Sequence, residues 1–143
     1  MSLERLALRD ARPEDESAVL ALWRAAYEAS SVRSTREDIP ALLSHGGSAR
    51  LLLAEIDGRL AATLIATFDG WRGNMYRLAV HPDYQRRGVA RRLVDEAHAW
   101  LKTLGCKRIT ALVEGGHDYA TGFWESAGYR HDAGMRRYSK KLD

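Results

Sequence analysis

The sequence predicts an α/β fold: a mixed, mostly antiparallel sheet of about six to seven strands, flanked by about four helices. Asp57-Gly58 lies between two apolar runs, which is typical of a β-hairpin. Residues 88–104 carry an apolar stripe at helical spacing. Strand and helix patterns also alternate along the second half of the chain. The 143 residues are 45% apolar and contain no repeat or linker, so we expect one domain over 1–143.

The first half predicts a strand, two helices and then a hairpin. Pro13 and the acids after it suit a first helical turn, and apolar residues recur at three- and four-residue spacing up to Tyr27. Ser34 and Glu37 form a capping box for a second helix, which Gly46-Gly47 should end. The expected strands of this half lie at 6–9, 50–56 and 60–68.

The second half predicts a strand, a long helix and a series of short elements. A turn at 69–73 leads into a strand over 75–80, which Pro82 should stop because proline cannot donate to a ladder. Gly105 suits the end of the long helix. After it we expect a strand at 109–113, a helix at 118–127, and strands at 129–131 and 135–141.

Composition narrows the class of protein. The net charge is only +3, and arginines cluster at 86–92 and 136–137 rather than over a broad face interleaved with aromatic residues, so we do not expect nucleic-acid binding. No run approaches the ~20 apolar residues of a membrane helix. The lone Cys106 excludes an internal disulfide and suits a reducing compartment, and the first residues do not resemble a signal peptide. We therefore expect a cytoplasmic protein.

The loop between the strand at 75–80 and the long helix has the chemistry of an anion site. A helix N-terminus presents unpaired N–H groups and partial positive charge, and Gly88 would let a ligand approach the backbone. Arg86, Arg87 and Arg91 add charge around the same opening. The glycine pattern fits neither a dinucleotide-binding fingerprint nor a Walker A loop. From the residues alone, the segment is either a site for a phosphate-bearing ligand or only a helix start that uses glycine.

Residues 78–90, LAVHPDYQRRGVA, resemble the signature of the GCN5-related N-acetyltransferase (GNAT) family. Gln85-Arg86-Arg87-Gly88-Val89-Ala90 matches the family's [QR]-x-x-G-x-[GA] loop at each fixed position. The resemblance continues through the strand at 109–113 and a helix ending FWESAGY at 123–129. It implies a single GNAT-like domain that moves an acetyl group from acetyl-CoA to a primary amine.

The resemblance also implies roles for individual residues. Backbone N–H groups of 86–90 would hold the CoA pyrophosphate, and the strand at 78–80 would pair with the pantetheine arm. The Val80 N–H would stabilise the oxyanion, and the amine would attack directly in a ternary complex, without an acyl-enzyme. The expected cofactor contacts are Leu78, Ala79, Val80, Gln85, Arg86, Arg87, Gly88, Val89, Ala90, Arg91, His117, Phe123 and Trp124.

The sequence departs from the family pattern at the proton-transfer positions. Trp124 stands where the family often has a tyrosine acid, and His117 where it commonly has asparagine. Leu112 occupies a position where some branches carry glutamate. Glu114, two residues on and on the same strand face, could be the general base through a water, or only a solvated strand-end residue. The general acid stays unassigned.

The acceptor and the assembly are open at this level. Tyr27, Trp71, Arg72 and Tyr76 are candidates for the acceptor pocket, by resemblance to the family. The acceptor could be a small molecule or a protein amine, and another acyl-CoA could be preferred. His81 and His98 lack ligand spacing, so no metal is expected. The run at 135–141 could close the sheet alone or pair with a second copy, which would make a homodimer.

Two rival functions use the same residues. The missing tyrosine and the displaced carboxylate would suit a non-catalytic acyl-CoA-binding module. The arginine clusters would suit a nucleic-acid-binding protein, whose affinity should fall steeply with salt and respond little to CoA.

Overall fold

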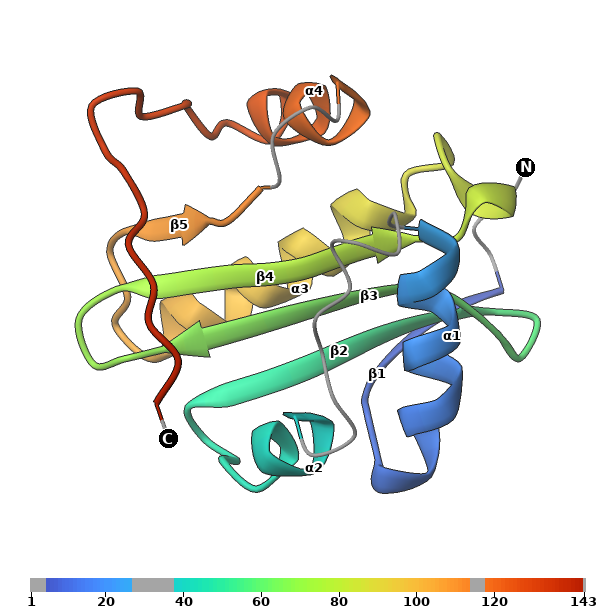
Figure 1. Cartoon of the computed structure of the whole chain (residues 1–143). Coiled ribbons are helices and arrows are strands. Elements are labelled where there is room, and N and C mark those ends of the chain that lie inside the picture. Colours follow the sequence, from blue (N-terminus) through green and yellow to red (C-terminus); the bar gives the residue numbers. More distant parts are fainter. Residues whose placement is uncertain (1–4, 27–37, 114–117, 143) are drawn as a thin grey trace. The chain divides into compact units, whose positions relative to one another are not determined.

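A computed structural model describes residues 5–26, 38–113 and 118–142 (Figure 1). The chain divides into two compact units, 1–112 and 113–143, and each is described here by itself. The predicted capping box at 34–37 lies outside the described residues.

The first unit is built on one five-stranded sheet. Its strands run in chain order: β1 (Leu6–Asp10), β2 (Ala49–Ile56), β3 (Arg59–Phe68), β4 (Gly73–Val80) and β5 (Ile109–Ala111). Neighbours from β1 to β4 are antiparallel, whereas β5 pairs with β4 in parallel. The mixed, mostly antiparallel sheet is therefore confirmed, but the prediction of six to seven strands is wrong.

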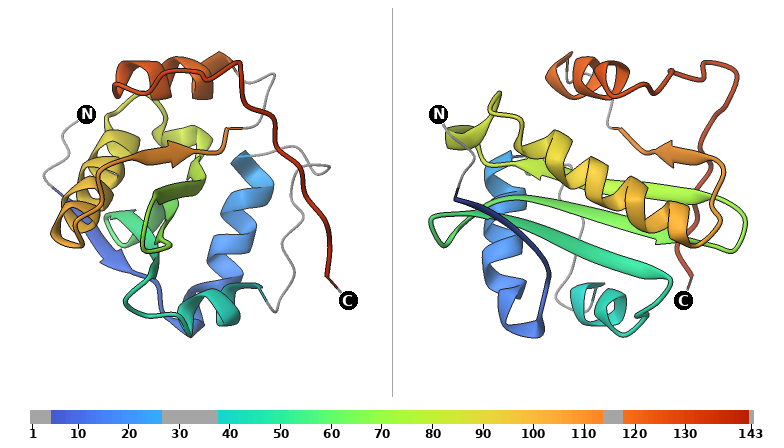
Figure 2. Two further views of the ribbon diagram at one scale, coloured as in Figure 1. Left: turned by 90° about the vertical axis from the view of Figure 1, so that its left-hand side faces the viewer. Right: turned by 180° about the vertical axis from the view of Figure 1, so that it is seen from behind.

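Helices cover both faces of this sheet (Figure 2). A 3-10 turn, η1 (Pro13–Asp15), leads into α1 (Glu16–Ala26), which lies with α2 (Asp38–Leu43) on one face. On the opposite face lies α3 (Val89–Thr103), which the right-hand view of Figure 2 shows in front of the strands. The α1–α2 face closes over Leu51, Leu53 and Ala79, which pack in one buried cluster with Val19 and Trp23.

The predicted β2–β3 hairpin forms as its turn residues require. Asp57 and Gly58 have φ of 53° and 77°, so both central positions are left-handed. This is the type I′ geometry whose twist matches the flanking strands, and Asp-Gly is among its preferred pairs. The turn places Ile56 opposite Arg59 and Glu55 opposite Leu60, and an irregularity then shifts the register by one residue, so that Ala54 lies opposite Ala62.

An ion-pair cluster joins the start of the first helical segment to the sheet edge. The Arg9 guanidinium donates to Asp15 at 2.7 and 2.8 Å and to Glu55 at 2.6 Å. Asp15 also accepts the Arg12 backbone N–H at 2.7 Å. The hydrogen bonds from Arg9 are the main cause that lowers the pKa of Asp15 to about 2. This carboxylate therefore stays charged over the physiological pH range.

The second unit contains α4 (Asp118–Ser126). Gly128 has φ of 93° and ends this helix, and the Tyr129 N–H donates to the Trp124 carbonyl. The strands predicted at 129–131 and 135–141 are wrong, because neither segment is a strand in the structure. Residues 130–142 are exposed, and 135–141 carries two arginines and two lysines, so it has no continuous apolar face to bury.

Candidate functional site

The loop after β4 has the geometry of an anion cradle. Gly88 is the N-cap of α3 at φ 81° and ψ 8°, and Arg86, two residues earlier, also has positive φ, at 63°. Left-handed positions alternating with ordinary ones turn successive backbone N–H groups toward a common concavity. The first residues of α3 add N–H groups with no acceptor inside the helix. Arg92 is the first to donate back, to the Gly88 carbonyl.

Side-chain burial limits what each loop residue can contribute. Gln85, Arg86, Arg87 and Gly88 are exposed, so this part of the loop is accessible to a ligand. The Val89 and Ala90 side chains are buried beneath the first turn of α3, at 1% and 6% exposure. These two residues can therefore offer a ligand only their backbone.

The approach to the loop is shaped by His81. Its N–H donates to the Ala61 carbonyl at 2.8 Å, which keeps the end of β4 on β3. Its Nδ1 accepts the Asp83 N–H at 3.1 Å and caps the short helix η3 (Pro82–Tyr84). The histidine is thus a local cap, in line with the structural role favoured by its sequence position.

The strands β4 and β5 part beyond Met75. Their described pairing covers Gly73 to Met75, followed by one bond from the Leu112 N–H to the Met75 carbonyl at 3.0 Å. β4 continues for five more residues to Val80, paired with β3 on its other side only, while β5 turns away from it (Figure 1). We call the edge of β4 over 76–80 that faces away from β3 the open edge, because no described strand pairs with it there.

Val80 presents its backbone to this open edge. The His81 N–H bonds to β3, so strand alternation turns the N–H and carbonyl of Val80 away from β3. Gln85 Nε2 donates to that carbonyl in a long hydrogen bond of 3.5 Å. By the same alternation Leu78 also faces the open edge, whereas the Ala79 backbone faces Thr63 on β3. Val80 is thus better placed than Ala79 to pair with a ligand.

A β-bulge in β4 determines which backbone groups face away from β3. Thr63 pairs with Ala79 and Ile65 with Tyr76, so Leu64 lies opposite two residues, Arg77 and Leu78. Arg77 takes a left-handed conformation at φ 53°. This bulge was not among the features predicted from the sequence. The only local signal was Thr63, a polar residue within the apolar run of β3.

Three of the predicted acceptor residues lie at two places, one in the middle of β4 and two in the turn that precedes this strand. Tyr76 is the first residue beyond the β4–β5 pairing, and its side chain is 36% exposed. Trp71 and Arg72 lie in the β3–β4 turn, with the Arg72 guanidinium 3.8 Å from the centre of the Trp71 ring. Asp69 holds that turn by accepting both backbone N–H groups. Tyr76 therefore adjoins the open edge, whereas the other two lie at the end of β4 opposite Val80.

Several predicted residues cannot be brought into this geometry. Tyr27, Glu114 and His117 lie outside the described residues. Phe123 and Trp124 belong to the second unit, where the Trp124 ring meets Phe123 and Tyr129 edge-on at 5.4 and 4.8 Å. Leu112, at the family's glutamate position, is 45% exposed. The roles predicted for the first five stay predictions.

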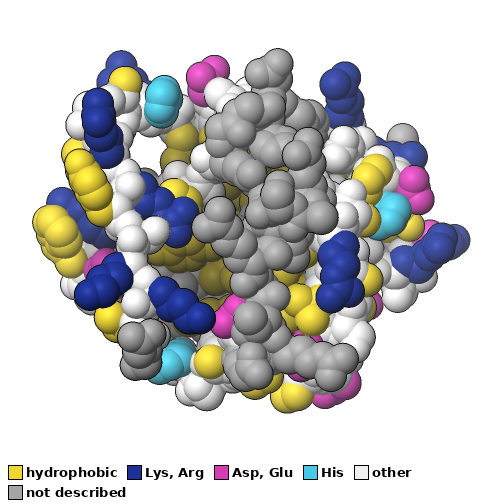
Figure 3. Space-filling view, viewed as in Figure 1, with side chains coloured by type: hydrophobic (Ala, Val, Ile, Leu, Met, Phe, Trp, Pro, Cys, Tyr) yellow, Lys and Arg dark blue, Asp and Glu magenta, His cyan; other side chains and the backbone are white. Residues whose placement is uncertain are grey.

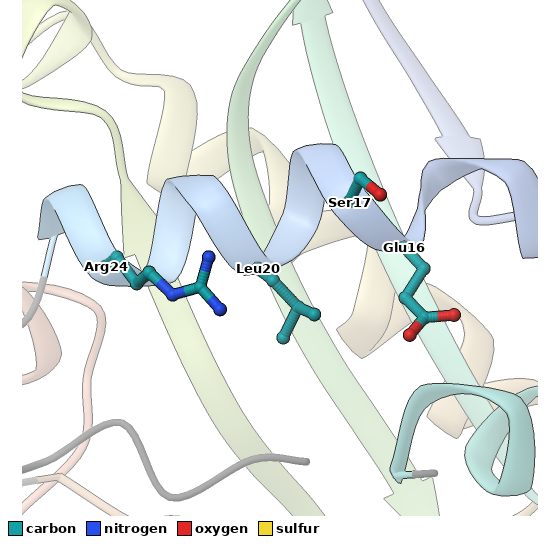
Figure 4. Close-up of a pocket in the computed structure, with 4 residues that line it drawn as sticks. All are labelled: Glu16, Ser17, Leu20 and Arg24. Atoms are coloured by element: carbon teal, nitrogen blue, oxygen red, sulfur yellow. The ribbon is translucent and has the colours of Figure 1, made fainter. Parts of the chain in front are cut away.

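A pocket of about 490 Å³ lies beside α1 (Figure 4). Its described lining is Glu16, Ser17, Leu20 and Arg24, all on that helix. None of the four belongs to β4, β5 or the Gln85–Ala90 loop, so we do not assign the anion site to this pocket.

The described part of the chain has neither a continuous basic surface on the face viewed nor a metal-site cluster. On the face that Figure 3 shows, Lys and Arg side chains occupy several separate places rather than one continuous patch. Among the described residues, no three His, Cys, Asp or Glu side chains group as a metal site would require. No helix within that part is both long and apolar enough to span a membrane. His98, half-buried in α3, has its pKa lowered chiefly by burial.

The sequence was then compared with known protein families. The model of the acetyltransferase (GNAT) family matches residues 16–129, about four fifths of the chain. The chain belongs to the GNAT family. The matched range contains the Gly88 loop, the open edge of β4 and α4, so the resemblance of the loop signature is confirmed, and the protein is an acyltransferase by family.

Solved structures share the fold at low sequence identity. A transcriptional regulator from Bacillus halodurans C-125 superposes with TM-score 0.80 at 17% identity, covering 96% of this chain and 99% of the other. Aminoglycoside 6′-N-acetyltransferase AAC(6′)-IG from Acinetobacter haemolyticus gives 0.77 at 21% identity, with 96% and 99% coverage. Aminoglycoside N-acetyltransferase AAC(6′)-Iy, solved in complex with CoA, gives 0.78 at 15% identity, with 96% and 95% coverage. At these sequence identities the similarity supports the fold of this GNAT protein but does not identify its substrate.

Proposed function

We propose that this GNAT protein transfers an acetyl group from acetyl-CoA to a primary amine by direct attack in a ternary complex. The proposal rests on one observation: the open edge of β4 leads directly into the loop with positive φ angles. The open edge of β4 ends at Val80, and the positive-φ loop at Arg86 and Gly88 follows within eight residues. An extended ligand with an anionic end fits this sequence of features, and CoA joins a pantetheine arm to a pyrophosphate.

The residues of this chain supply binding and polarisation. Backbone N–H groups at Gly88, Val89 and Ala90 would bind the pyrophosphate, with charge added by Arg86 and Arg87. Leu78 and Val80 would pair with the amides of the pantetheine arm as an added strand does. This leaves the thioester carbonyl beside the open edge, where the Val80 N–H would donate to its oxygen.

The reaction then needs a neutral amine and a departing thiolate. The amine nitrogen attacks the thioester carbon, the C–S bond breaks, and an amide and CoA thiol result after proton transfer. The Val80 N–H stabilises the negative charge that grows on the carbonyl oxygen, and one such donor is typically worth a factor of about 10² to 10³ in rate. Glu114 and Trp124 keep their proposed roles as water-mediated base and pantetheine contact.

The proposed acceptor is a primary amine. Two of the structural neighbours named above are aminoglycoside acetyltransferases, which makes amino sugars a first class to screen. Tyr76 beside the open edge offers an aromatic face to such a ring, and Trp71 with Arg72 offers a second at the far end of β4.

Thermal unfolding tests the cofactor assignment first. The protein is heated alone and with acetyl-CoA, free CoA or ATP, each at a high concentration. A ligand at ~100 times its dissociation constant adds about 2.7 kcal/mol, which is several degrees for a domain of this size. We expect both CoA forms to shift the midpoint more than ATP does. If neither CoA form shifts it, the loop is only a helix start and the proposal fails.

Thiol release then separates catalysis from binding. Acetyl-CoA is incubated with a panel of amines, comprising an amino sugar, a polyamine, lysine and a peptide N-terminus, and free thiol is followed spectrophotometrically. Steady release with at least one amine is the expected result. A thermal shift with no release above the amine-free rate would instead favour the non-catalytic acyl-CoA-binding module.

A further inference from the structure

We propose that Thr63 and Trp23 are positioning residues for the transfer reaction, because together they hold the β4 bulge that aims the Val80 N–H at the thioester. This rests on the proposed function, since it assigns a role within the same site. Both side chains are remote from the open edge in sequence, and both are buried, at 0% and 1% exposure.

The bulge decides which backbone groups face the open edge. The Met75 carbonyl faces β5, since it accepts the Leu112 N–H. Unbroken alternation from Met75 would therefore turn Arg77 and Ala79 toward the gap. The extra residue shifts this by one, so that Leu78 and Val80 face it instead. Removing the bulge would exchange the Val80 N–H for that of Ala79.

A chain of hydrogen bonds from α1 holds the bulge in place. Trp23 Nε1 donates to Thr63 Oγ1 at 2.9 Å, and Thr63 Oγ1 donates to the Arg77 carbonyl at 3.1 Å. Because the hydroxyl accepts from the indole, its single proton is directed to the carbonyl. The Arg77 guanidinium lies 5.0 Å from the centre of the same indole ring. Two contacts thus meet at Arg77, the one residue with left-handed φ in β4, and the Trp23–Thr63 hydrogen bond joins them.

Because the hydrogen bonds from Trp23 to Thr63 and from Thr63 to Arg77 are buried, they favour one backbone conformation of the bulge. The left-handed conformation is unfavourable for a residue with a side chain, and it persists where surrounding contacts determine it. A bulge carbonyl that has left the ladder needs another donor, because an unpaired buried polar group is costly. Thr63 is that donor, and Trp23 orients it. The pair therefore links α1 to the direction of an N–H on the opposite edge of β4.

The test compares Thr63→Val with Thr63→Ser. Valine keeps the shape of threonine but can neither accept from Trp23 nor donate to Arg77, whereas serine keeps the hydroxyl. Trp23→Phe is the third variant, since it keeps an aromatic ring and removes the indole donor. Each is measured for thermal unfolding, CoA affinity by calorimetry, kcat with an active amine, and the infrared carbonyl frequency of bound acetyl-CoA labelled with ¹³C at the carbonyl.

We expect Thr63→Val to lower kcat at least about tenfold while CoA affinity changes less than threefold, as a misdirected donor would. The bound carbonyl frequency, lowered by polarisation in the parent, should move back toward its value in solution. Thr63→Ser should stay within about threefold of the parent in kcat and keep its frequency. Trp23→Phe should fall between the two.

The outcomes separate this inference from the function on which it rests. If the parent binds acetyl-CoA and lowers its carbonyl frequency, and Thr63→Val or Trp23→Phe does so equally, the positioning role is wrong and the proposed function stands. If the parent shows neither binding nor a lowered frequency, the proposed function fails and the inference with it. Should Thr63→Val not fold, the frequencies of Thr63→Ser and Trp23→Phe decide in the same way.

Discussion

Gly88→Asp tests the anion site at the start of α3 most directly, and Gly88→Asn is its matched control. The position has φ 81° and ψ 8°, so any side chain there adopts a left-handed backbone. Asparagine and aspartate tolerate that conformation better than most residues and pay a similar cost of about 1 kcal/mol. The two variants have nearly equal shape and differ by one negative charge. Their difference in CoA affinity therefore isolates electrostatics.

The size of that difference follows from the exposure of the loop. A carboxylate ~6 Å from a pyrophosphate with about two negative charges meets a repulsion of about 3 kcal/mol at an effective dielectric constant of ~40, a value between protein and water. Salt at about 0.15 M roughly halves this, because the Debye length is then ~8 Å. We therefore expect Gly88→Asp to bind CoA about tenfold more weakly than Gly88→Asn at physiological salt, and about 100-fold at low salt.

Isothermal titration calorimetry with CoA at two salt concentrations measures this directly. Gly46→Asp is a further control. Gly46 is exposed and has open space for a side chain, and the substitution adds the same charge in the turn after α2. It should bind CoA like the parent protein. Equal affinities for Gly88→Asp and Gly88→Asn at both salt concentrations would show that no anion lies at this loop, and the cofactor assignment would have to be given up.

Three further substitutions test the fold and the chemistry. The pKa of Asp15 is lowered to about 2, so its pairing with Arg9 stabilises the fold above pH ~4, and this stabilisation is lost as the pH falls toward 2. Asp15→Asn should therefore lower the free energy of unfolding in urea by about 2 kcal/mol at pH 7 and by little at pH 2. An equal loss at both pH values would refute this pH dependence. Gly73→Ala places a Cβ 3.0 Å from Cys106 Sγ and should destabilise by about 1–3 kcal/mol, partly recovered by Cys106→Ala; an unchanged melting temperature would contradict this crowding. Trp124→Tyr should raise steady-state thiol release if proton delivery to the thiolate limits turnover, and an unchanged rate would show that it does not.

Those parts of the fold that depend on local signals could be predicted from the sequence. Asp57-Gly58 determines a hairpin because the turn type requires two left-handed residues. The α3 stripe and Gly88 likewise predict where the long helix begins, since periodicity and a flexible glycine are properties of consecutive residues. The loop signature lies at this junction, so the candidate site was predicted from the same residues as the start of the helix.

Features that depend on distant partners could not be predicted. A strand was predicted at 135–141, but a strand needs a neighbour and a face to bury, and these residues are exposed. Nothing within β4 itself signals the bulge, because Arg77 is not a residue that favours positive φ. Trp23 lies in the core, which suits the helical spacing of apolar residues before Tyr27, but its hydrogen bond to Thr63 spans 40 positions of sequence.

In the proposed reaction the loop would serve CoA binding and the bulge would serve catalysis, although both belong to β4 and its continuation. Gly88 lies outside the sheet and would contact only the anionic end of CoA, so changes there should alter affinity and leave the reacting carbonyl alone. Thr63 contacts the strand and no ligand, so changes there should alter the polarised carbonyl and leave affinity alone. β4 joins the two, because Val80 ends the strand and His81 binds its end to β3. A protein that only bound CoA would need the loop and the open edge, but it would gain nothing from aiming the Val80 N–H. The buried polar chain from Trp23 to Arg77 is therefore better explained by catalysis than by binding.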